Sequence, residues 1–126
     1  MGQAVKGRYM QEITLDIIPG LDAPAVCYAS QKDNNRRVKI NLTENRKRYA
    51  LTGQELLTLQ MRTQSGERLT AAMDNPGGSQ IIAEFTEAMT QAAGANVCSI
   101  HIKVNEHKEI TSAKFALQFE GKPNRR

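Results

Sequence analysis

Short stretches in which every second residue is apolar recur along this chain, and they constrain the fold more than any other feature. In the centre of the chain, Val38, Ile40 and Leu42 alternate with polar residues, and residues 57–61 repeat the pattern. A period of two places alternate side chains on opposite faces of a strand. We therefore predict strands here that each have one buried and one solvated face.

Small polar residues separate these stretches and suggest how they connect. Residues 33–35 and 64–66 combine Asp, Asn, Gln, Ser and Gly, which tolerate turn conformations. This arrangement predicts two hairpins, one over residues 28–42 and one over 56–73, that share an apolar side. Residues 51–53 would turn the chain between them.

Further stretches of the same kind extend the pattern along most of the chain, at residues 12–18, 26–31, 80–85, 96–105 and 110–119. About seven or eight short strands separated by turn residues are typical of an all-β fold, an antiparallel β-sandwich. Residues 86–93 interrupt the alternation. Thr86 as an N-cap, helix-favouring residues and Gly94 as a stop predict one short helical turn there.

The length of 126 residues fits one domain. We expect a flexible leader over residues 1–11, a single sandwich domain over 12–120, and the start of a linker or a disordered tail over 121–126. No apolar run approaches the roughly 20 residues of a membrane-spanning helix. The first residues also lack the layout of a signal peptide, because charged and amide side chains interrupt them.

Basic residues exceed acidic ones, 17 against 13, and give a formal net charge of +4. They gather at Arg36–Arg37, at Arg46–Arg48 and at residues 125–126. A small basic β domain could place such clusters on phosphates, so nucleic-acid binding is the alternative function. The three Phe fall on predicted core faces and the three Tyr are scattered, which leaves no aromatic platform for stacked bases.

Cys27 and Cys98 match no zinc or redox spacing. Both lie in strand-like stretches, so buried free thiols are the simplest interpretation. A disulfide between facing sheets, as in immunoglobulin domains, stays open as an alternative. The lack of Trp, and Asn96 where a tyrosine corner would need an aromatic residue, argue against a true immunoglobulin domain.

The histidines offer little chemistry. His101 falls on the polar face of its strand, and His107 lies in a turn between two glutamates, so a metal site would need a third ligand close by. Cys98 and His101 are expected to face opposite sides of one strand, which argues against a nucleophile–base pair.

Acidic residues at Asp16, Glu84 and Glu120 lie on or near strands, where carboxylates usually face solvent. No serine sits in a nucleophile elbow, and the glycine pair at 77–78 does not open a helix after a strand. We therefore predict no catalytic, cofactor-binding or metal-binding residues, and no enzyme activity.

Several short motifs follow one another in a particular order. They are Ser30-Gln-Lys-Asp33, Leu51-Thr-Gly53, Thr86-Glu87-x-Met89 followed by Gly94, and Ser112-x-x-Phe115. In this order and spacing, residues 12–120 resemble the N-terminal domain of the baseplate upper protein of tailed phages (siphophages) and their prophage relatives. The chain departs from that family at Ser65-Gly66, where Asp-Gly is usual, and in its long loop at 19–24.

The resemblance implies a non-enzymatic, virion structural protein without cofactors. Members of the family use this domain to attach to the central baseplate hub, and the rest of the protein positions receptor-binding proteins for host adhesion. It implies location in the tail baseplate after assembly in the bacterial cytoplasm. It further implies an oligomer in the virion and protein partners rather than membrane or nucleic acid. The loops at 33–37 and 43–48 are candidate contacts by exposure and charge.

Overall fold

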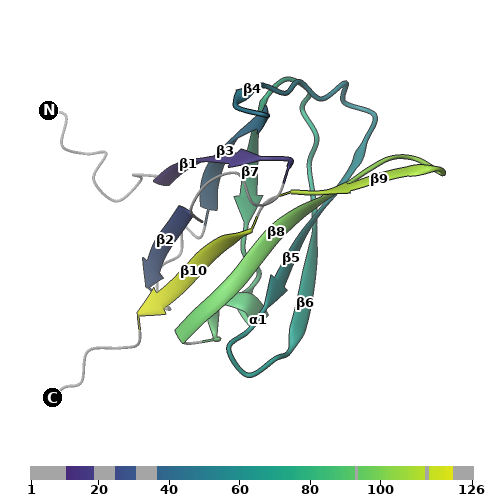
Figure 1. The fold of residues 1–126 in the computed structure, drawn as a ribbon. Helices are drawn as coiled ribbons and strands as arrows, with labels where there is room; N and C mark the ends of the chain where they lie inside the picture. Colours follow the sequence, from purple (N-terminus) through teal and green to yellow (C-terminus); the bar gives the residue numbers. More distant parts are fainter. Residues whose placement is uncertain (1–10, 19–24, 31–36, 93, 113, 121–126) are drawn as a thin grey trace, which may run out of the picture.

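The structure, a computed structural model, describes residues 11–18, 25–30, 37–92, 94–112 and 114–120. Within these ranges the chain forms two β-sheets and one short helix (Figure 1). The elements are β1 (Gln11–Asp16), β2 (Ala25–Ser30), β3 (Arg37–Glu44), β4 (Lys47–Arg48), β5 (Leu56–Arg62), β6 (Arg68–Met73), β7 (Gln80–Glu84), α1 (Glu87–Thr90), β8 (Gly94–Asn105), β9 (Lys108–Thr111) and β10 (Phe115–Glu120).

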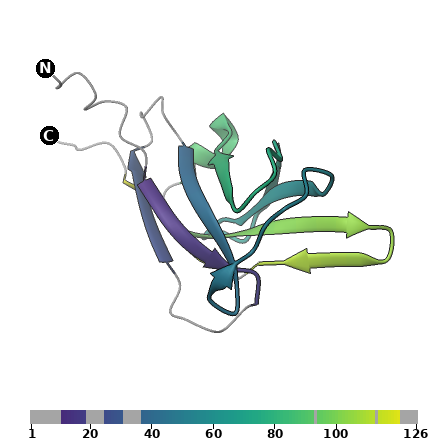
Figure 2. The same ribbon diagram turned by 90° about the horizontal axis from the view of Figure 1, so that it is seen from above.

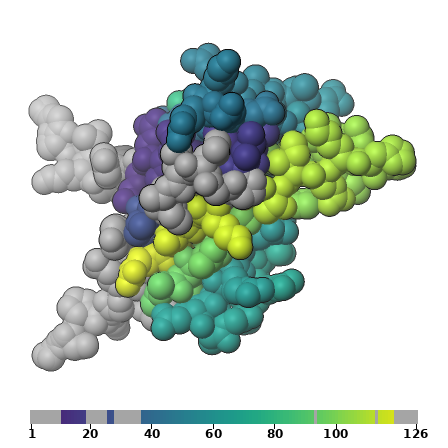
Figure 3. Space-filling view, in the orientation of Figure 1, coloured from purple at the N-terminus to yellow at the C-terminus, as the bar shows by residue number. Residues whose placement is uncertain are grey.

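Sheet A is built around β3, which pairs with β1 on one side and with β7 and β4 on the other. Sheet B follows the order β2-β10-β8-β5-β6, and β9 adds to the far half of β8. β8 is the longest strand, at 12 residues. Its end with β9 forms a hairpin that extends beyond the rest of the molecule (Figures 1, 2 and 3).

The predicted all-β sandwich is confirmed, and its core is mostly aliphatic. The inward positions of β3, β5, β7 and β8 are buried, as the alternation predicts. Side chains from both sheets meet in one cluster, in which Ile40, Leu59, Ile81, Ile100 and Phe115 have no exposed surface.

The two sheets are mixed rather than purely antiparallel. β1 pairs with β3 in parallel, and β2 pairs with β10 in parallel; the other pairings are antiparallel. A period-two pattern reports which face of a strand is buried, but it carries no information on the direction of the neighbour. The parallel pairs arise because the chain crosses between the sheets from β1 to β2 and again from β2 to β3.

The first predicted hairpin is wrong, whereas the second is correct. β2 and β3 lie in different sheets and do not pair, although residues 28–42 had suggested a hairpin. β5 and β6 do pair, from Leu57↔Met73 to Arg62↔Arg68. Turn residues 33–35 of the predicted first hairpin lie outside the described residues.

The predicted final strand is divided. Residues 108–111 form β9 and residues 115–120 form β10, and both run along the same side of β8. Ser112 is buried between them. The Ile100 backbone N–H donates to Ser112 Oγ at 2.9 Å and the Ser112 N–H donates to Ile100 O at 2.9 Å, so this residue bridges the break in the ladder. With the two-residue β4, this division makes ten strands in the described part of the chain.

The predicted helical turn is present as α1, four residues long. Thr86 caps it, because its Oγ1 accepts a hydrogen bond from the Met89 N–H at 3.2 Å. Met89 is fully buried against the core, which holds so short a helix in place.

Candidate functional site

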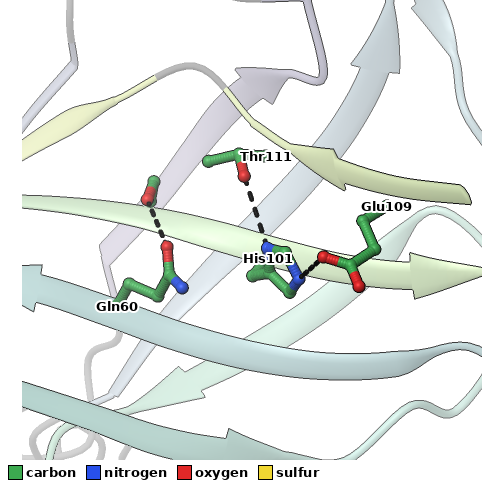
Figure 4. Close-up of polar contacts among 5 residues, drawn as sticks. Gln60, His101, Glu109 and Thr111 are labelled. Carbon is green, nitrogen blue, oxygen red and sulfur yellow. Dashed lines mark hydrogen bonds and ion pairs between the residues drawn. The ribbon is translucent and has the colours of Figure 1, made fainter.

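The two histidines are separate and engaged with near neighbours. His101, on β8, lies 3.0 Å from Glu109 Oε1 through Nε2 and 3.3 Å from Thr111 Oγ1 through Nδ1 (Figure 4). His107 is exposed in the β8–β9 turn. Among the described residues no group of three His, Cys, Asp or Glu side chains is placed to hold a metal ion.

The cysteines are buried free thiols, which resolves the alternative that the sequence left open. Both lie in sheet B rather than in facing sheets. β10 separates them, with Leu117 beside Cys27 and Phe115 beside Cys98. Two strand spacings are about 10 Å, beyond the reach of a disulfide. Burial raises the pKa of Cys27 to about 11 and that of Cys98 to about 12, so neither is an activated nucleophile.

Asp16, at the end of β1, is a structural carboxylate. Its Oδ1 accepts from the backbone N–H groups of Ile18 (2.9 Å) and Asn45 (3.1 Å), and its Oδ2 accepts from Thr43 Oγ1 (2.8 Å) and the Arg46 N–H (2.7 Å). Asn45 and Arg46 form the β3–β4 turn with positive φ, 53° and 70°. Burial alone would raise the pKa of Asp16, but these hydrogen bonds outweigh it and lower the pKa to about 2.

Glu55 plays a similar part and was not recognised from the sequence. It is 6% exposed and accepts from the Thr52 and Gly53 N–H groups at 3.1 and 3.2 Å and from Asn75 Nδ2 at 2.9 Å. Burial raises its pKa, and the bonds from Thr52 and Asn75 reverse that and lower it to about 2. Glu55 thus joins two loops, and the signal for it is only the Thr-Gly-x-Glu spacing of a tight turn.

The other acidic residues considered from the sequence, Glu84 and Glu120, give no evidence of a binding or catalytic site. Glu84 is exposed on β7, opposite Arg37 in the register of sheet A. The side chain of Glu120 lies outside the described residues, as does Arg36. Lys47 and Arg48 are exposed at the β3–β4 turn, at the other end of β3 from Arg37.

Basic side chains from separate segments meet on the outer face of sheet B. Arg62 on β5 and Arg68 on β6 are exposed and directly opposite each other. With Lys114 they line an open hollow of about 620 Å³, which we call the cationic hollow. Its other walls include Thr70, Ser99 and Val97. Sequence reasoning missed this site because its basic residues come from three separate segments.

No protein-family model matches the chain, and no curated protein matches it significantly in sequence. The search of solved structures does give matches. The fold resembles the N-terminal domain of phage TP901-1 ORF48. The TM-score is 0.59 at 13% identity, and the match covers 88% of this chain and 99% of that domain. The likeness to a phage domain that the motifs indicated is therefore confirmed at the level of the fold.

No helix among the described residues is long and apolar enough to cross a membrane.

Proposed function

We propose that this chain is a non-enzymatic structural module of a phage or prophage tail baseplate, which anchors a receptor-binding apparatus to the central baseplate hub for host adhesion. The observation that carries the proposal is the structural match over nearly the whole of a phage domain. The order of turn and core motifs in the sequence supports the same class of protein.

The chemistry of the described residues fits a scaffold. The two buried carboxylates, Asp16 and Glu55, accept hydrogen bonds from backbone N–H groups of neighbouring loops. The thiols are buried and carry raised pKa values. The ionisable groups that remain exposed among the described residues are spread over both sheets.

The test is capture of tail proteins. The tagged chain is co-expressed with the products of neighbouring tail genes and purified at moderate salt. We expect a stable complex with a hub protein by size-exclusion chromatography, and none with an unrelated virion protein of similar charge. A chain that captures no tail protein contradicts the proposal.

Nucleic-acid binding, the alternative from composition, is tested in parallel by electrophoretic shift. If it were the function, neutralising Arg46, Lys47 and Arg48 would weaken DNA binding and flatten its salt dependence. We expect no shift at physiological salt. Tight and salt-sensitive DNA binding would favour the alternative.

A further inference from the structure

The basic side chains around the cationic hollow repel one another, and no carboxylate in the described part of the chain neutralises them. Arg62 and Arg68 are a directly opposed cross-strand pair, and like charges in that position repel. None of the described carboxylates forms an ion pair with Arg62, Arg68 or Lys114, whereas Glu109 on the same face pairs with His101 (Figure 4). The free protein therefore presents three cations around one hollow.

The register places these cations in two rows that cross the sheet. Arg68, Arg62 and Val97 stand side by side on β6, β5 and β8. Thr70, Gln60 and Ser99 form the next row, and Ser99 Oγ donates to Gln60 Oε1 at 3.5 Å. Lys114 precedes Phe115, which pairs with Cys98, so the lysine lies at the far end of this second row.

We propose that the cationic hollow binds an acidic segment of a partner protein, with one carboxylate on the arginine pair and a second near Lys114. This deepens the proposed function, since it rests on a protein-docking role. Arginine suits the first contact because its planar fork binds a carboxylate through two hydrogen bonds. β5 and β10 lie two strands apart, about 10 Å, which an extended segment spans in roughly three residues.

The walls of the hollow favour a peptide over other anions. Val97 is 42% exposed and adds apolar surface beside the hydroxyls of Thr70 and Ser99. This mixture suits the aliphatic parts of acidic side chains and the polar groups of a peptide backbone. A single-stranded nucleic acid would stack its bases on exposed aromatic rings, and none lines the hollow.

The test uses the isotope-labelled chain and two short blocked peptides, one with Glu at alternate positions and one with Gln in place of each Glu. We expect the Glu peptide to shift the amide signals of residues 60–62, 68–70 and 97–99, and the Gln peptide to leave them unchanged. Arg62→Gln/Arg68→Gln should weaken binding by about tenfold or more. The matched control is Arg37→Gln/Lys39→Gln, which removes the same charge from sheet A and should keep the affinity within about twofold.

A second measurement separates a binding role from a structural one. Because the arginines repel in the free chain, Arg62→Gln/Arg68→Gln should leave the melting temperature unchanged or raise it. A lowered melting temperature together with unchanged peptide affinity would overturn the proposal. So would equal signal shifts from inorganic phosphate at the same ionic strength, or tighter binding of a DNA oligonucleotide at these residues.

The failures of the two proposals can be told apart. If a hub protein is captured equally well by wild type and by Arg62→Gln/Arg68→Gln, the hollow is not the docking site although the baseplate role stands. If the Glu peptide binds as expected but no tail protein is captured, the baseplate role fails and the acidic-segment site stands.

Discussion

Asp16→Asn is the substitution that most directly tests how the β1 end and the β3–β4 turn hold together. The carboxylate accepts four hydrogen bonds, two on each oxygen. An amide keeps one oxygen and turns an NH₂ group toward the donors on the other side. The better orientation keeps the Ile18 and Asn45 bonds and lets the Thr43 hydroxyl rotate to accept from the NH₂ group, but it breaks the bond from the Arg46 N–H to Asp16.

The loss can be estimated from these bonds. The loss of one charge-assisted bond to this partly buried carboxylate costs about 1.5–3 kcal/mol, and the remaining bonds weaken when the acceptor becomes neutral. We therefore expect the free energy of unfolding to fall by about 3 kcal/mol, which for a domain of this size lowers the melting temperature by roughly 10 °C. Urea unfolding followed by circular dichroism measures the change.

The control is Glu12→Gln on the same strand. Glu12 is exposed and accepts one hydrogen bond, from Asn41 Nδ2 at 2.7 Å, which the amide oxygen of glutamine can replace. Its expected cost is below about 0.5 kcal/mol. An Asp16→Asn variant within about 1 kcal/mol of wild type, or a Glu12→Gln variant that loses as much, would refute the reasoning.

The same carboxylate predicts the pH dependence of stability. The pKa of Asp16 is lowered from 3.8 to about 2 in the folded state, so its stabilisation is present above pH 3.8 and is lost as the pH falls through about 2. Glu55, lowered from 4.5 to about 2, adds a loss of the same sign. Wild type should therefore lose stability between about pH 5 and pH 2, with a shallower slope in Asp16→Asn. Equal slopes in the two proteins would show that Asp16 is not ionised in the way the hydrogen bonds require.

Three further predictions concern the core and its edges. Gly94→Ala should cost more than Gly66→Ala, since both residues have φ near +95° but only a Cβ at 94 would displace the Gln64 side chain. We expect the free energy of unfolding, measured in urea, to fall by about 2 kcal/mol for Gly94→Ala and by about 1 kcal/mol for Gly66→Ala. Equal losses would show that the contact with Gln64 does not matter. Cys27 and Cys98 should not react with a thiol reagent at pH 8 until the chain unfolds, and rapid labelling of the native protein would contradict their burial. Asn96→Ala should cost about 3 kcal/mol, because this buried amide donates to the carbonyl oxygens of Ala92, Gly94 and Leu117, and a loss below about 1 kcal/mol would show that water replaces it.

The local alternation of apolar and polar residues was enough to predict much of the sandwich. The alternation at Val38–Leu42, Leu57–Met61 and Cys98–Val104 identified faces that the structure buries, because period-two burial is a property of each strand alone. The glycine pair at 77–78 lies between β6 and β7, where both residues take positive φ, a conformation that glycine adopts readily. The Thr86 cap was also local, since donor and acceptor are three residues apart.

Pairing and polar networks were decided only by the tertiary structure. Nothing local to residues 28–42 shows that β2 pairs with β10 rather than with β3, because strand pairing depends on where distant segments pack. Asp16 gains its role from residues about 30 positions away, and the cationic hollow unites Arg62, Arg68 and Lys114 across β5, β6 and the start of β10. The buried face of a strand follows from the periodicity of that strand alone. Charged side chains from different strands come close to one another only after the sheet has formed.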